Sequence, residues 1–140
     1  MNENRIMGID FGEVKIGIAI SDPLKIIASP YKTINRKKTP NYITEIEKIV
    51  EEKKVESIVV GYPLTLSGKK SKQTELTENF INELNNFLDV SVYKCDERLS
   101  SQEASRYLRE QKIKTGHNKE KVDRVSASII LSQFLLSYKR

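Results

Sequence analysis

Hydrophobic and polar positions alternate along the beginning of the chain in the manner of β-strands. Residues 5–11 and 14–21 alternate in this way on either side of a short turn, which predicts two strands joined as a hairpin. Residues 25–34, KIIASPYKTI, predict a third strand. Pro30 is expected to shorten this strand, because proline has no N–H group to donate to a neighbour.

Further along the chain the apolar spacing changes to three and four residues, which is the period of an amphipathic helix. One such helix is predicted over residues 41–54 and another over 73–88. Their apolar faces comprise Ile43, Ile46, Ile49 and Val50 in the first, and Leu76, Phe80, Leu84 and Phe87 in the second. The other predicted elements are strands over 55–61 and 89–95, helices over 100–110 and 120–137, and a polar, basic loop over 111–119.

This order of elements predicts the fold class. Three consecutive strands followed by alternating helices and strands indicate an α/β protein with a mixed five-stranded sheet and helices on both faces. At 140 residues the chain is long enough to bury a substantial core, so residues 1–140 are predicted to form a single domain.

Composition excludes several classes of protein. No apolar run approaches the roughly 20 residues that span a bilayer, and the N-terminal MNENR lacks a signal-peptide pattern, so a cytoplasmic protein without a membrane partner is expected. The chain has one cysteine, Cys95, and one histidine, His117, which excludes an internal disulfide and a Cys- or His-rich zinc site. Any bound metal would be held mainly by carboxylates, which favours Mg²⁺ or Mn²⁺.

Positive charge gathers in the predicted connecting segments. The formal net charge is +5, and residues 23–40 contain five basic side chains and no acid. The segment SGKKSK adds Lys69, Lys70 and Lys72, again without an acid. This distribution is typical of a surface that binds nucleic acid, with solvated loops as the alternative.

Asp10 is the first of three acidic positions at the ends of predicted elements. Alternation along the first strand places Asp10 on the same face as Ile6 and Gly8, and the glycine leaves room for another group to approach. A carboxylate at the end of a buried strand needs a compensating positive charge. The alternative is that Asp10 and Gly12 only form a turn.

The second position is the segment CDERLSS, residues 95–101. Ser100 and Glu103 fit a capping box at the start of the next helix, but this pairing does not explain the acids that precede it. Asp96, Glu97 and Arg98 combine carboxylates with a guanidinium, which suits a metal ligand beside a phosphate-binding group.

The third position is Asp123, on the predicted final helix. Spacings of four, three and four residues place it on the same side as Ala127, Ile130 and Phe134. An acid in the first turn of a helix also interacts favourably with the helix dipole, which is the alternative explanation. If the three acidic positions converge, their mutual repulsion requires a divalent cation, as in phosphodiester hydrolysis.

Four segments together resemble the YqgF/RuvX family of bacterial RNase H-like nucleases. They are GIDFGEVKIGIAISD (8–22), IVVGYPLTLSG (58–68), DERLSSQEA (96–104) and KVDRVSASIIL (121–131). Members of this family are described as Holliday junction resolvases and as nucleases that mature the precursor of small-subunit rRNA. The resemblance implies an RNase H-like fold and a metal-dependent nuclease, with Asp10, Glu97 and Asp123 as the catalytic and metal-binding carboxylates.

The resemblance also implies a nucleic-acid partner. The predicted substrate is the 5′ end of precursor 16S rRNA; branched DNA is the alternative, and a junction resolvase would require a homodimer.

Where the family often has two basic residues, this chain has Val14 and Lys15, so one positive charge is missing. The loop over 111–119 is expected to become ordered on substrate. The residues predicted to bind substrate are Arg98, Lys15, Lys69, Lys70, Lys72, Lys112, Lys114, His117, Lys119, Lys121 and Arg124.

The sequence bears on three other functions. GYPLTLSGKK differs from a nucleotide-binding P-loop, because six residues rather than four separate Gly61 from Gly68 and Lys70 takes the hydroxyl position. An ATP-binding protein of the actin-like and sugar-kinase superfamily would need two domains of this kind. A non-catalytic RNA-binding or ribosome-assembly factor is the third alternative. The absence of Trp and the presence of only four Phe disfavour a pure single-strand binder.

Overall fold

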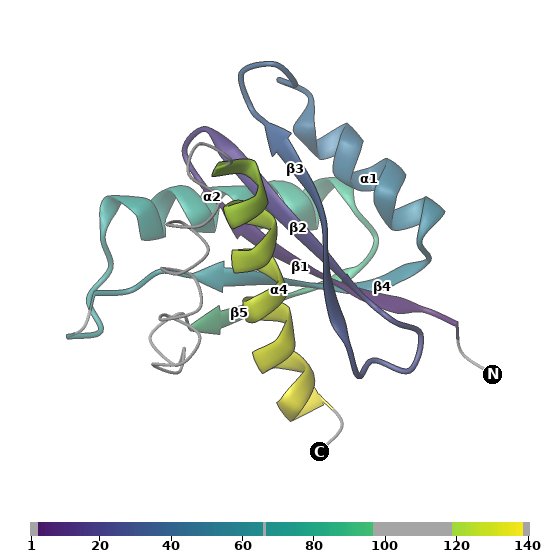
Figure 1. The fold of residues 1–140 in the computed structure, drawn as a ribbon. Coiled ribbons are helices and arrows are strands. Elements are labelled where there is room, and N and C mark those ends of the chain that lie inside the picture. Colours follow the sequence, from purple (N-terminus) through teal and green to yellow (C-terminus); the bar gives the residue numbers. More distant parts are fainter. Residues whose placement is uncertain (1–2, 66, 97–118, 139–140) are drawn as a thin grey trace.

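The computed structural model describes residues 3–65, 67–96 and 119–138 (Figure 1). The elements in these residues are β1 (Arg5–Phe11), β2 (Lys15–Ser21), β3 (Ala28–Asn35), α1 (Tyr42–Glu52), β4 (Val55–Tyr62), α2 (Lys72–Phe87), β5 (Ser91–Asp96) and α4 (Lys119–Tyr138).

The strands form one mixed sheet in the order β3-β2-β1-β4-β5. Strand β2 pairs antiparallel with both β1 and β3, whereas β4 pairs parallel with both β1 and β5. The predicted mixed five-stranded sheet is therefore confirmed. Because β1, β4 and β5 run in the same direction, their carboxyl ends meet at one edge of the sheet.

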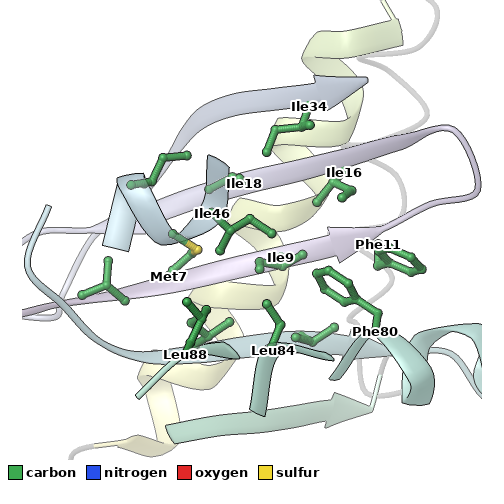
Figure 2. Packing of buried hydrophobic residues seen from close by; sticks show 14 of the residues in the cluster. Met7, Ile9, Phe11, Ile16, Ile18, Ile34, Ile46, Phe80, Leu84 and Leu88 are labelled. Carbon is green, nitrogen blue, oxygen red and sulfur yellow. The ribbon is translucent and has the colours of Figure 1, made fainter. Parts of the chain in front are cut away.

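Helices α1 and α2 cover one face of the sheet and enclose the larger core (Figure 2). Met7, Ile9 and Phe11 point from β1 into this core, and the Phe11 ring stacks on Phe80 of α2 with centroids 4.1 Å apart. Fully burying a side chain of this size stabilises the fold by about 1.5–3 kcal/mol. The alternation predicted for the first strand is thus confirmed on this face.

Helix α4 lies across the opposite face, as Figure 1 shows. The core beneath it is smaller and joins Ile6, Ala19 and Val59 of the sheet to Ala127 and Leu131 of the helix. Gly8 and Gly17 on the same face allow the helix backbone to approach the sheet closely. This arrangement confirms helices on both faces of the sheet.

The predicted strand over 25–34 begins later than expected, because the preceding residues form a fixed loop. The Asp22 carboxylate accepts hydrogen bonds from the N–H groups of Ile26 and Ile27, each at 2.8 Å, and the strand β3 starts only at Ala28. Pro30 lies opposite Ala19, where the register of β2 and β3 shifts.

The apolar face predicted for the helix over 73–88 is wrong at its C-terminal end. Phe87 is 67% exposed, whereas Thr74, Thr77 and Ile81 are buried. Helix α2 ends at Phe87, and Leu88, in an extended conformation, is buried instead. The predicted helix over 120–137 is confirmed by α4. The predicted helix over 100–110 and residues 111–118 of the predicted loop lie outside the described residues. No helix in the described part of the chain is long and apolar enough to cross a membrane.

Candidate active site

Asp10 lies near the carboxyl end of β1, on the face of the sheet that α4 covers. Ile6, four residues earlier on the same face of β1, is buried under α4, and Gly8 contacts the same helix. Asp10 itself is half-buried at the rim of this face. The face predicted for Asp10 is therefore confirmed.

A glycine brings the start of α4 next to Asp10. Gly17 of β2 is the register partner of Asp10. A Cβ atom at Gly17 would lie only 2.0 Å from the carbonyl oxygen of Asp123 and 3.1 Å from the backbone nitrogen of Arg124. Since real Cβ atoms do not come so close, only glycine allows this approach. The main chains of Asp10 and Asp123 therefore both lie against Gly17.

A second close approach fixes the direction of α4 across the sheet. A Cβ atom at Gly8 would lie 2.7 Å from Leu131 Cβ and 2.8 Å from the carbonyl oxygen of Ala127. Contacts at two glycines of neighbouring strands hold the helix at two points along its length. Asp123, four residues before Ala127, is thereby held at the strand end that carries Asp10.

The end of β5 completes this edge of the sheet. Asp96 is the last residue of β5 and lies opposite Tyr62, the last residue of β4. Two strand spacings of about 4.8 Å separate β5 from β1. Glu97, the third predicted carboxylate, and Arg98, the predicted phosphate contact, come directly after Asp96 and lie outside the described residues.

A surface pocket of about 540 Å³ opens beside Asp123. The turn between β1 and β2 forms its other wall, with Gly12, Glu13, Val14 and Lys15. Lys15, a predicted substrate contact, therefore lines the same pocket as Asp123. Arg124, another predicted contact, follows Asp123 on α4 and is half-buried.

Arg36 holds this turn in place. Its Nη1 donates hydrogen bonds to the carbonyl oxygens of Gly12, at 3.0 Å, and Glu13, at 2.8 Å. The guanidinium also lies over the rings of Phe11 and Tyr42, 4.5 and 5.3 Å from their centroids. In the sequence, Arg36 is one of five basic residues in 23–40. Nothing in the sequence pattern indicated that it would position this turn.

Gln73 of α2 fixes the other end of the turn. Its side-chain Nε2 donates to the carbonyl oxygen of Phe11, the residue after Asp10, at 3.0 Å. The backbone after Asp10 is thus tied both to α2 and to Arg36. Nothing in the sequence pattern indicated a role for Gln73, because its contact joins residues 62 positions apart.

The basic segment after β4 forms a small hairpin in which Leu64 pairs with Lys70. Lys69, Lys70 and Lys72 are all exposed. Lys70 Nζ lies 2.9 Å from Glu78 Oε1, and the Tyr62 hydroxyl donates to the same carboxylate. The hydrogen bond from Tyr62, followed by that from Lys70, lowers the pKa of Glu78 below its ordinary value. The hydrogen bond to Glu78 raises the pKa of Lys70.

The remaining predicted contacts lie at the start of α4 or before it. Lys119 and Lys121 belong to the first turn of α4, although their side chains are not described. Lys112, Lys114 and His117 lie outside the described residues.

The carboxylates of this edge fit a hard divalent cation. Asp10 and Asp123 offer oxygen donors, the type that Mg²⁺ and Mn²⁺ take, at one strand end. In the described part of the chain no cluster of three or more His, Cys, Asp or Glu side chains is present. The described residues include two of the three predicted ligands, Asp10 and Asp123, and the third, Glu97, lies outside them.

Comparison with known proteins identifies the family. The RuvX family, described as a Holliday junction resolvase, matches residues 4–137. The chain belongs to the RuvX family. A RuvX relative from Roseiflexus sp. (strain RS-1), named "Putative pre-16S rRNA nuclease", is 37% identical over 135 residues, which cover 96% of each chain. A protein of the same name from Amoebophilus asiaticus (strain 5a2) is 41% identical over 139 residues, covering 97% of this chain and 96% of its own.

Solved structures share the fold of this RuvX chain. One is titled "T. thermophilus RuvC in complex with Holliday junction substrate"; it is 12% identical, with a TM-score of 0.58 over 97% of this chain and 96% of its own. Fowlpox virus resolvase in complex with Holliday junction DNA is 11% identical, with a TM-score of 0.58; the match covers 97% of this chain and 99% of that chain. The predicted RNase H-like class is confirmed by these likenesses, and the prediction of a nuclease is confirmed at the level of the RuvX family.

Proposed function

We propose that this chain is a cytoplasmic, metal-dependent nuclease that cleaves phosphodiester bonds at the 5′ end of precursor 16S rRNA. The observation that carries the proposal is the contact at Gly17, which brings the backbones of Asp10 and Asp123 to one strand end. The backbones of two acids that are far apart in the sequence thus lie against the same glycine.

Asp10, Glu97 and Asp123 are the proposed metal ligands and catalytic residues. A magnesium or manganese ion held by these carboxylates would offset the repulsion among them and would supply activation of the water that attacks the phosphodiester. The strand β1 and the helix α4 hold the backbones of Asp10 and Asp123. No side chain acts as a nucleophile in this proposal, because Cys95 and the serines have no histidine base near them in sequence.

The basic residues around this edge are proposed to hold the substrate backbone. Lys15 lines the pocket beside Asp123, and Lys69 and Lys72 are exposed on and just after the hairpin that follows β4. Lys70 would have to exchange Glu78 for a phosphate before it could bind substrate. The other residues proposed to contact the substrate are Arg98, Lys112, Lys114, His117, Lys119, Lys121 and Arg124.

The names of the full-length relatives favour precursor rRNA as the substrate. The description of the RuvX family and the junction-bound neighbours support a second candidate, cleavage of a four-way DNA junction by a homodimer. The two candidates differ in the number of active sites needed, since a symmetric junction requires two.

One assay separates these candidates. Purified protein is incubated with MgCl₂, an RNA carrying the precursor 5′ extension of 16S rRNA, and a four-way DNA junction in parallel reactions. We expect Mg²⁺-dependent cleavage of the RNA, at a rate well above that on the junction. Faster paired cuts in the junction would favour the resolvase, and no cleavage of either would contradict the nuclease.

A further inference from the structure

The C-terminal half of α4 and the strand β5 carry an aromatic cluster at the surface. It consists of Tyr93, Phe134 and Tyr138, which we call the aromatic edge. The ring centroids of Tyr93 and Phe134 are 5.3 Å apart, and those of Phe134 and Tyr138 are 5.5 Å apart. Tyr93 is 43% exposed and Tyr138 37%, so both rings present area to solvent.

A pocket of about 590 Å³ adjoins this cluster. Phe134 forms part of its wall, together with the polar residues Asp96, Gln133 and Ser137. Strand β5 is the last strand of the described sheet on this side. The pocket therefore combines an aromatic surface with hydrogen-bonding groups, and an amide such as Gln133 can both donate and accept.

We propose that the aromatic edge and its pocket bind an unpaired nucleobase of a single-stranded substrate. Aromatic side chains stack on bases irrespective of sequence, because every base has a π-face. A base inside a continuous duplex is already stacked on its neighbours and cannot enter such a pocket. The inference rests on the proposed function and narrows its substrate to nucleic acid with a single-stranded segment.

The position of the pocket fits a strand that continues from the proposed active site. One helix, α4, carries both Asp123 and Phe134, and eleven residues at a rise of 1.5 Å separate them by about 16 Å. Strand β5 carries Tyr93 and leads through Asp96 into Glu97. Two of the three elements that would supply carboxylates, β5 and α4, thus also supply the aromatic edge, whereas β1 supplies Asp10 alone.

The chemistry of the aromatic edge favours a base over a protein partner. A second exposed apolar group, Leu24, Ile26 and Ile27, is aliphatic, and aliphatic side chains offer no stacking surface. The aromatic edge, by contrast, carries two exposed tyrosines that flank Phe134. Phe134 lines a pocket that combines apolar side chains with Lys94 and Gln133, in a chain of net charge +5.

The test measures binding in EDTA, so that it is independent of cleavage. A fluorescent single-stranded RNA and a blunt duplex of the same sequence are titrated with wild type, Tyr93→Leu and Tyr138→Leu. We expect each variant to lose affinity for the single strand by about 5- to 100-fold, the loss typical of one stacked base, with little change on the duplex. Tyr93→Phe should bind as wild type does, because it keeps the ring.

Phe87→Leu is the matched control, because Phe87 is an aromatic residue at the end of α2 that is 67% exposed. Phe87→Leu should change neither the affinity for the single strand nor the affinity for the duplex. A 2-aminopurine base in the single strand should lose emission on binding wild type and less on binding Tyr93→Leu. The inference would be overturned if Tyr93→Leu lost affinity equally for the single strand and the duplex, or lost none. It would also be overturned if Tyr93→Leu changed its oligomeric state while its affinity stayed the same. A protein that binds through these tyrosines but never cleaves would instead contradict the proposed function alone.

Discussion

At Gly17 a hydrogen atom takes the place of a side chain, and the first turn of α4 touches the sheet there beside Asp10. An isolated glycine within a strand often marks such a close backbone approach, so its position in the sequence carried a usable signal. Arg36 and Gln73 act at the same scale, since they fix the turn that follows Asp10.

Substitution of Gly17 tests this contact. Gly17→Ala would place Cβ 2.0 Å from the Asp123 carbonyl oxygen, so α4 must shift. We expect unfolding in urea to show a destabilisation of about 1–3 kcal/mol, and cleavage to be nearly lost. Gly8→Ala, which meets α4 at Ala127 and Leu131, should destabilise similarly but retain more activity per folded molecule. Equal losses of activity would contradict a specific role for Gly17.

Removal of the Arg36 guanidinium should loosen the turn without weakening nucleic-acid binding directly. Arg36→Met keeps an aliphatic contact with Phe11 and Tyr42 but leaves the Gly12 and Glu13 carbonyls without this donor. We expect a loss of about 1–3 kcal/mol in unfolding free energy and slower cleavage, because the pocket wall moves. Lys37→Met, an exposed neighbour, serves as the control. An unchanged stability, with weaker nucleic-acid binding, would make Arg36 a phosphate contact instead.

The loop before β3 depends on an ionised Asp22. Burial raises the pKa of this carboxyl, but hydrogen bonds from the N–H groups of Ile27 and Ile26 outweigh burial and lower the pKa below its ordinary 3.8. A carboxyl with a lowered folded-state pKa stabilises the fold above its unfolded pKa, and this stabilisation is lost as the pH falls through the folded value.

Asp22→Asn keeps an acceptor but removes the charge. We expect wild type to be more stable than Asp22→Asn near neutral pH, and the difference in unfolding free energy to shrink as the pH falls below about 4. Urea unfolding of both proteins across this range measures the difference. A difference that stays constant with pH would contradict ionic stabilisation of the loop.

At the scale of elements, the basic hairpin after β4 is attached to α2 through Lys70. Its ammonium lies 2.9 Å from Glu78, whereas Lys69 and Lys72 form no ion pair within the described part of the chain. Three lysines that look equivalent in the sequence therefore differ in what they offer a phosphate.

The salt dependence of binding distinguishes these lysines. We expect Lys69→Gln and Lys72→Gln each to lower the log–log slope of affinity for single-stranded RNA against salt by about 0.7, one phosphate contact each. Lys70→Gln should lower the slope less, because its charge is already engaged by Glu78. A slope change for Lys70→Gln equal to that for Lys69→Gln would show that substrate displaces Glu78.

The elements were largely predictable because each has a clear apolar period. Alternation placed Ile6, Gly8 and Asp10 on one face of β1, and helical spacing placed Ala127 and Ile130 on the buried side of α4. Phe87 was misplaced because spacing alone does not show that the helix ends there and Leu88 turns inward. The contacts of Arg36 and Gln73 were not predictable, since they join segments that only the folded sheet brings together.

At the scale of the whole molecule, α4 joins the proposed chemistry to the proposed binding of substrate. It carries Asp123 at its start, contacts two glycines of the sheet along its length, and ends in the aromatic edge. The basic segment of residues 23–40 is less available than its composition indicates. Lys25 and Lys32 form ion pairs with Glu56 and Glu45.

The measurement that tests the central claim is the Mg²⁺-dependent cleavage rate of the precursor 16S rRNA 5′ end by wild type, Asp10→Asn and Asp123→Asn. Asp89→Asn, an exposed acid in the turn before β5, is the matched control. The account predicts cleavage by wild type and Asp89→Asn and almost none by the other two. Mg²⁺ should also raise the melting temperature of wild type but not of Asp10→Asn. Near-normal turnover by a folded Asp10→Asn or Asp123→Asn would contradict the site.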